Sequence, residues 1–190
     1  MAYYHPDLTY VRDFQRHKEN QISNSDYANG NFRRFLIDFR VARRLNSKRE
    51  DRFSALLTLT LDWVKKTPKD VDGFVNSLKT TGLTRDEKEI SLVSKILFLN
   101  SPQTIPPFDS NVKSAAWKIA HQRINSYHDY HTFFTEFKKA NINEIKSRLT
   151  FVKDYLSVME SDFKGEIQDL EAIRLNRYVD KLLWVLGSSR

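Results

Sequence analysis

The chain has 190 residues, of which 40% are hydrophobic, 13% aromatic and 29% charged. This composition suits a globular protein with a full apolar core and argues against a disordered chain. The formal net charge of +7 favours a polyanionic partner, with nucleic acid as the first choice and a membrane surface as the alternative. The absence of cysteine excludes disulfides, iron–sulfur clusters, cysteine-ligated zinc and a thiol nucleophile.

The first residues, from Met1 to Leu8, lack the basic-then-apolar order of a secretory signal. The longest apolar runs span only a few residues, which is too short for a membrane-spanning helix. We therefore expect a cytoplasmic protein with no membrane partner. No pattern in the chain calls for a cofactor, and none is expected.

Hydrophobic periodicity predicts helices over residues 8–18, 26–46, 48–66 and 70–79. The helix over 26–46 has the strongest pattern, because phenylalanines and a leucine recur at the three- and four-residue spacing of a buried face. Its apolar positions are Phe32, Phe35, Leu36 and Phe39. Pro68 ends the helix over 48–66, since a proline disfavours helix in the residue before it.

In the second half, Thr84 and Glu87 have the spacing of a capping box and predict a helix that runs to about residue 100. Further helices are expected over 109–120, 130–140, 142–161 and 165–186, with Gly187 as the cap of the last. No alternating strand pattern is present, so the sequence predicts an all-α fold. We expect a single helical domain over 1–190. It could form two lobes, one of 1–68 with the C-terminal helices and one of 69–140.

Positive charge is densest between residues 33 and 52. Arg33, Arg40 and Arg44 fall on one face of the predicted helix, where guanidinium groups suit phosphate contacts. A solvated outer face explains the same pattern. The candidate nucleic-acid contacts are Arg33, Arg40, Arg43, Arg44, Lys48, Arg49 and, further along, Lys113.

His128 and His131 have a spacing at which two imidazoles can share a metal ion, and His121 lies shortly before them. A metal site needs a third or fourth ligand in the right geometry, and histidines on a surface or between helices explain the pattern equally well. No metal is expected.

Lys88, Ser91 and Lys95 lie near one another on the predicted helix, at spacings of three and four. Lys95 stands inside the almost continuous apolar run of residues 92–99. It must either extend its ammonium to solvent or sit in a pocket that lowers its pKa. Desolvation of that kind makes a lysine amine a usable nucleophile.

Asp109 stands at the start of the next helix, where a carboxylate accepts a free backbone N–H. Capping alone explains this residue. Pro106 and Pro107 also fix the chain in front of the preceding helix, so that the carboxylate could face Lys88 or Lys95.

The stretch Pro-Gln-Thr-Ile-Pro-Pro-Phe-Asp-Ser-Asn-Val over 102–112, continued by Trp-Lys-Ile-Ala over 117–120, resembles the catalytic-aspartate segment of the helix-hairpin-helix DNA glycosylases. The 8-oxoguanine glycosylase branch is the most similar. The resemblance covers about residues 82–120 and implies a compact helical domain of the glycosylase type. It implies Asp109 as the catalytic carboxylate and a Schiff-base lysine, for which Lys95 and Lys88 are the alternatives. The chain departs from the family in its hairpin, which keeps only Gly82.

This resemblance implies excision of a damaged or modified base from DNA, with or without strand cleavage through a lysine imine. Phe108 and Trp117 are the candidate stacking residues of the base pocket, although such aromatics are also typical of a core. One alternative is a non-catalytic module of the same fold that binds nucleic acid or a nucleotide. Another is a helical regulatory or defence protein whose protein partner the sequence does not identify.

Overall fold

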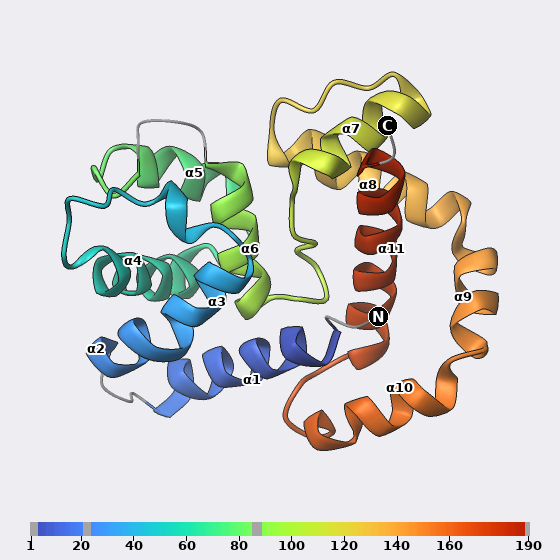
Figure 1. The fold of residues 1–190 in the computed structure, drawn as a ribbon, viewed down its shortest axis with the longest axis horizontal. Helices are drawn as coiled ribbons and strands as arrows, with labels where there is room; N and C mark the ends of the chain where they lie inside the picture. The colour runs from blue at the N-terminus through green and yellow to red at the C-terminus, as the bar shows by residue number, and fades with distance from the viewer. Residues whose placement is uncertain (1–3, 21–23, 85–88, 189–190) are drawn as a thin grey trace.

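The computed structural model describes residues 4–20, 24–84 and 89–188 (Figure 1). Within these ranges every regular element is a helix, and the one β-type pairing is an isolated bridge between Leu45 and Thr84. The predicted all-α class is confirmed. No helix in the described ranges combines the length and the apolar character needed to cross a membrane.

The chain forms eleven α-helices in the ranges described, joined by short helical turns over Ala28–Phe32, Ala42–Arg44 and Ser161–Phe163. The α-helices are α1 (Tyr4–Asn20), α2 (Asn24–Tyr27), α3 (Arg33–Asp38), α4 (Arg52–Lys66), α5 (Val71–Lys79), α6 (Ile90–Asn100), α7 (Ser110–Ala120), α8 (Tyr127–Ala140), α9 (Ile142–Thr150), α10 (Lys153–Glu160) and α11 (Leu170–Ser188). Figure 1 shows α2 to α6 on one side and α7 to α11 on the other, with α1 along the lower edge. The segment from α6 to α7 passes between the two groups.

Helix α6 forms the centre of the core. Every residue from Leu92 to Leu99 is buried, and α1, α4 and α5 pack against this helix. Complete burial of a leucine, isoleucine or phenylalanine side chain contributes about 1.5–3 kcal/mol, so this run is a major source of stability. The same burial removes Lys95 from bulk water, because its position in the run faces protein on all sides.

The predicted helix over 26–46 is wrong in its second half, because α3 ends at Asp38. Arg40 then adopts a left-handed conformation with φ of 58°, which turns the chain out of the helix. The turn allows Val41 and Leu45 to be buried, each with 2% of its surface exposed. Arg40 and Arg44 therefore do not share a helix face with the arginine at position 33, as the periodicity had indicated.

The predicted helix over 84–100 begins later than expected. Glu89 has the non-helical angles φ −85° and ψ 54°, and α6 starts at Ile90. Thr84 is instead held in the bridge to Leu45. Glu87, the other half of the expected capping box, lies outside the described residues.

The predicted helix over 142–161 is divided into α9 and α10 by a turn at Phe151 and Val152. The turn directs α10 towards the start of α11. There the Glu160 carboxylate accepts hydrogen bonds from the Tyr4 hydroxyl at 2.7 Å and from Arg174 at 2.6 and 2.9 Å. A single straight helix would carry this buried carboxylate away from both donors.

The expected role of Gly187 as a C-terminal cap is wrong, because this glycine lies inside α11. A Cβ atom at Gly187 would lie 1.7 Å from the carbonyl oxygen of Asn111. Glycine is therefore required for the close packing of α11 against the first turn of α7. That turn begins directly after Asp109.

Replacing Gly187 with alanine should force α7 and α11 apart. We expect Gly187→Ala to lower the free energy of unfolding by about 1–3 kcal/mol, as overpacking does elsewhere. The neighbouring exposed substitution Ser188→Ala is the control and should change it by less than about 0.5 kcal/mol. Urea denaturation measures both, and equal stability of the two variants would contradict the close approach.

Candidate functional site

Lys95 of α6 and Asp109 at the start of α7 meet in the structure. The Lys95 Nζ atom lies 3.5 Å from Asp109 Oδ2 and donates a hydrogen bond of 3.2 Å to the carbonyl oxygen of Phe39. Only 8% of the Lys95 surface is exposed, so the ammonium does not extend into bulk solvent. The structure thus brings together two of the residues singled out in the sequence.

Burial makes the Lys95 ammonium easier to deprotonate than that of an exposed lysine. Burial lowers the pKa of Lys95 below the ordinary lysine value, and the carboxylates of Asp109 and Asp180 offset part of that effect. A buried amine of this kind is available as a nucleophile at a lower pH than an exposed lysine.

The Asp109 carboxylate has two roles at once. Its Oδ1 atom accepts a hydrogen bond of 3.0 Å from the backbone N–H of Asn111, which caps α7, while Oδ2 faces Lys95. The side chain is 31% exposed. A carboxylate held by a helix N-terminus on one side and open to solvent on another can meet both a lysine and a ligand.

Two tyrosines of α8 hold the loop that carries the carboxylate. The Tyr127 hydroxyl donates to the Pro106 carbonyl at 2.9 Å, and the Tyr130 hydroxyl donates to the Pro107 carbonyl at 3.0 Å. Burial raises the pKa of both hydroxyls, so both remain protonated donors. The prolines have no N–H of their own, and their carbonyl groups are the means by which this backbone is anchored.

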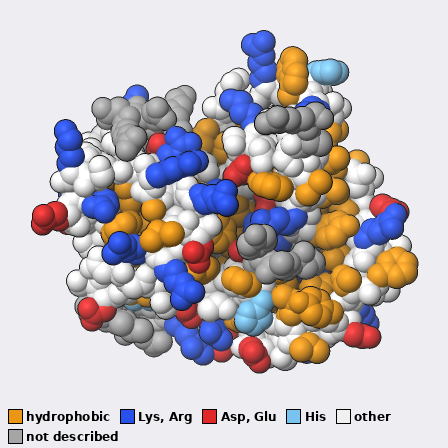
Figure 2. Space-filling view, in the orientation of Figure 1, with side chains coloured by type: hydrophobic (Ala, Val, Ile, Leu, Met, Phe, Trp, Pro, Cys, Tyr) orange, Lys and Arg blue, Asp and Glu red, His pale blue; other side chains and the backbone are white. Residues whose placement is uncertain are grey.

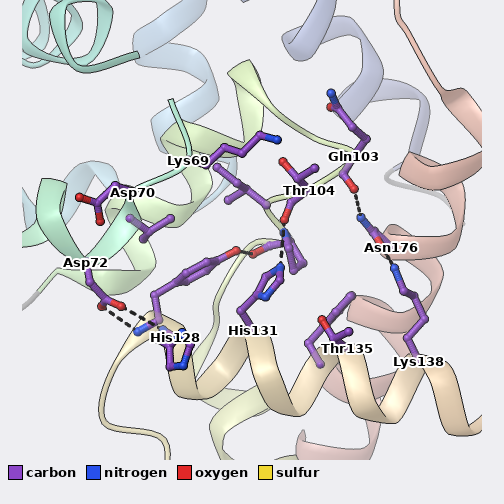
Figure 3. Close-up of a pocket in the computed structure, with 15 residues that line it drawn as sticks. Lys69, Asp70, Asp72, Gln103, Thr104, His128, His131, Thr135, Lys138 and Asn176 are labelled. Atoms are coloured by element: carbon purple, nitrogen blue, oxygen red, sulfur yellow. Dashed lines mark hydrogen bonds between the residues drawn. The ribbon is translucent and has the colours of Figure 1, made fainter. Parts of the chain in front are cut away.

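The same loop forms one wall of a groove of about 580 Å³, shown in Figure 3. Asn176 of α11 donates to the Gln103 carbonyl at 2.8 Å, and Nε2 of His131 lies 3.2 Å from the Thr104 carbonyl. Lys138 in turn donates to the Asn176 amide oxygen at 2.8 Å. Asn176 and His131 therefore contact the loop directly and Lys138 supports it through Asn176, in addition to the two tyrosines.

A buried ion network lies next to Lys95. The Arg177 guanidinium of α11 contacts the Asp7 carboxylate at 2.5 Å and the Asp180 carboxylate at 2.7 Å, and it lies 5.4 Å from the centre of the Phe98 ring. Burial raises the pKa of both carboxyl groups, and the arginine opposes this rise. Because the charge of Asp180 also acts on Lys95, the network is electrostatically continuous with the site.

The two predicted base-pocket aromatics lie in different surroundings. Lys88 falls outside the described residues. Phe108 is buried and packs edge-on against Tyr130 at 5.2 Å, whereas Trp117 is 50% exposed near the far end of α7. The structure therefore does not bring the two aromatics together in one pocket beside Asp109.

The predicted nucleic-acid contacts fall into two groups. Three of the arginines contact other side chains: Arg33 lies over the Phe53 ring, Arg44 is 3.6 Å from Glu89, and Arg49 makes a two-point contact with Asp51. The exposed remainder comprises Arg40, Arg43, Lys48 and Lys113. These four side chains and Arg33, which is also exposed, are the more accessible cations for a polyanion.

The histidines considered as metal ligands are dispersed. His131 faces the Thr104 carbonyl, while His121 lies against the Trp117 ring, with 5.5 Å between the ring centres. Among the residues that the structure describes, no group of three or more His, Asp or Glu side chains could hold a metal ion.

Arg177 should be essential for stability because its loss leaves two buried carboxylates without their partner. We expect Arg177→Met to lower the free energy of unfolding by about 3–5 kcal/mol. The matched control is Arg148→Met, which breaks an exposed pair with Glu144 at 2.7 Å and should leave the stability almost unchanged. Urea denaturation of both variants checks this, and a similar small loss in both would contradict the buried network.

No protein-family model, curated protein or solved structure matches this chain. The function must therefore be argued from the site itself. Its defining features are a buried lysine, a loop-held carboxylate and the ion network beside them.

Proposed function

We propose that the protein is a DNA glycosylase that removes a damaged or modified base, with Lys95 as the amine nucleophile and Asp109 as the catalytic carboxylate. The observation that carries this proposal is the approach of Lys95 Nζ to 3.5 Å from Asp109 Oδ2. The resemblance of residues 102–120 to the glycosylase segment names the chemistry, and the paired side chains are the two groups that this chemistry needs.

In the proposed reaction, the target nucleotide turns out of the base stack and its sugar approaches the lysine and the carboxylate. The N-glycosidic bond breaks, and its electron pair leaves with the base, which takes up a proton. Asp109 stabilises the positive charge that develops on the sugar. The deprotonated Lys95 amine adds to C1′ of the sugar and loses a proton. The C1′–O4′ bond then breaks, its electron pair goes to O4′, which takes up a proton, and an imine between Lys95 and C1′ remains.

The charge near the site supports a DNA partner. Arg40 is exposed and directly follows Phe39, whose carbonyl accepts the Lys95 hydrogen bond. Arg43 and Lys48 are exposed on the same connection. Figure 2 shows lysine and arginine side chains gathered across the middle of this face, where phosphates would meet guanidinium and ammonium groups.

A non-catalytic nucleic-acid-binding protein is the second candidate. It is favoured by the contacts of Lys95, because the ammonium already has an acceptor in Phe39 and a counter-ion in Asp109 without any substrate. Such a protein would bind DNA or RNA with a steep dependence on salt and would release no base.

A protein-binding role is favoured by a different surface. Phe151, Tyr155 and Val158, at and after the turn between α9 and α10, have 82%, 61% and 73% of their surface exposed. Figure 2 shows hydrophobic side chains concentrated on the side of α9 to α11. Exposed apolar groups of this kind mark contact surfaces when they are contiguous.

Borohydride trapping tests the proposed nucleophile. Wild-type protein is incubated with duplex and single-stranded oligonucleotides carrying damaged or modified bases, beginning with 8-oxoguanine, and imines are reduced to stable adducts. We expect an adduct that Lys95→Ala lowers by at least about 100-fold, since the amine forms the covalent bond. Lys88→Ala and the exposed control Lys139→Ala should retain it. If no base in the panel gives an adduct or an abasic product, the enzyme proposal is contradicted.

The pH dependence of trapping should report the Lys95 amine. Its rate is expected to rise with pH and to reach half its maximum below pH 10.5, the ordinary lysine value, because burial lowers this pKa. Asp109→Asn removes a charge that raises the pKa of Lys95. The midpoint should therefore move to a still lower pH, while the maximal rate falls by about 100-fold. A midpoint that moves upward in Asp109→Asn would contradict the assignment.

A further inference from the structure

One row of side chains on α7 leads away from Asp109. Lys113 and Trp117 lie four residues apart on one face of α7, and Asp109 caps the helix four residues before Lys113. Lys113 is exposed and Trp117 is 50% exposed. The core contact of α7 is made by a different face that contains Val112 and Ala116, so packing of the helix does not account for the tryptophan.

The row ends at a pocket of about 320 Å³. Its lining residues are Lys113, Trp117, Gln122, Arg123, Ile124 and Asn125. His121 adopts a left-handed conformation with φ of 50° and turns the chain back at the end of α7. As a result, the Arg123 guanidinium lies 5.9 Å from the centre of the Trp117 ring.

The chemistry of this lining is that of a nucleotide site. Among the described residues, the wall holds two cations, two side-chain amides, an indole and an isoleucine, with no carboxylate to repel a phosphate. An indole stacks on any base, and amides can donate to and accept from base edges. The volume is at the lower end of the range for small-ligand sites, which suits one nucleotide rather than a larger ligand.

We infer that this pocket holds an unpaired nucleotide of the same DNA strand that reacts at Asp109. The base stacks on the exposed part of the Trp117 indole, and the phosphates contact Lys113 and Arg123. This inference rests on the proposed function, because it takes Asp109 as the point where the strand is processed.

The distance between Asp109 and Trp117 limits how many nucleotides separate the reacting nucleotide from the one in the pocket. Trp117 lies eight residues after Asp109, which corresponds to about 12 Å along the helix axis. A strand stacked as in duplex DNA rises about 3.4 Å per nucleotide and an unpaired strand is more extended, so the span matches at most about three to four nucleotides. A base whose edge meets the Gln122 and Asn125 amides is unpaired, and the favoured substrate is therefore single-stranded DNA or an open bubble rather than a closed duplex.

Intrinsic fluorescence tests the pocket without any damaged base. The chain has three tryptophans, and Trp184 of α11 is 43% exposed and outside the pocket, which makes it a matched control. Unmodified single-stranded oligonucleotide should quench wild-type and Trp184→Phe protein, whereas Trp117→Phe should lose the quenching. Loss of quenching in Trp184→Phe with retention in Trp117→Phe would overturn the inference.

Binding measurements give a second readout. Trp117→Ala should weaken binding of a single-stranded oligonucleotide by about tenfold, and the variant should remain folded at the temperature of the assay because the side chain is half exposed. Lys113→Ala should reduce the slope of log affinity against log salt by about one, and Lys139→Ala should not. Unchanged affinity in Trp117→Ala or an unchanged slope in Lys113→Ala would overturn the inference.

The trapping assay separates this inference from the proposed function. An adduct that forms equally well in wild-type and Trp117→Ala protein, on bubble and duplex alike, would leave the glycosylase in place and overturn the nucleotide pocket. Quenching of Trp117 by oligonucleotide without any adduct would support the pocket and contradict the glycosylase.

Discussion

The burial of one lysine in the core helix is the constraint on which the rest of the site depends. The Lys95 side chain is held in the core because every residue of α6 from Leu92 to Leu99 is buried. Its ammonium is stabilised where it lies by a carbonyl oxygen, by the Asp109 carboxylate and by the charge of Asp180. The N-terminal and C-terminal helices are joined in the same place, because Arg177 links Asp180 to Asp7. The same charged groups therefore serve the proposed reaction and link α1 to α11.

The position of Asp109 is determined by backbone contacts on both sides of it. Before it, the carbonyl groups of two prolines accept hydrogen bonds from tyrosines of α8. After it, the first turn of α7 packs so closely on Gly187 that no side chain fits between them. A carboxylate positioned in this way keeps its distance to Lys95 without help from a ligand, which is the preorganisation that electrostatic catalysis requires.

Structural features determined by residues close together in the sequence could be predicted, whereas features determined by residues far apart in the sequence could not. Asp109 is a helix cap with a proline loop before it, and Lys95 stands out in an apolar run, so their meeting could be anticipated. The end of α3 could not, because the left-handed turn at Arg40 serves the burial of side chains beyond it. Arg177 and Asp7 are 170 residues apart, and periodicity carries no information about such a pair. The sequence signal for this pair was the presence of polar residues on the apolar face of α11.

The covalent bond between Lys95 and the sugar is the central step of the proposed reaction. Peptide mapping of the borohydride-reduced adduct by mass spectrometry locates this bond. The added mass of the sugar fragment should lie on Lys95, within the peptide of α6. An adduct located on any other lysine, or a protein that releases no base and carries no added mass, would contradict the proposed reaction.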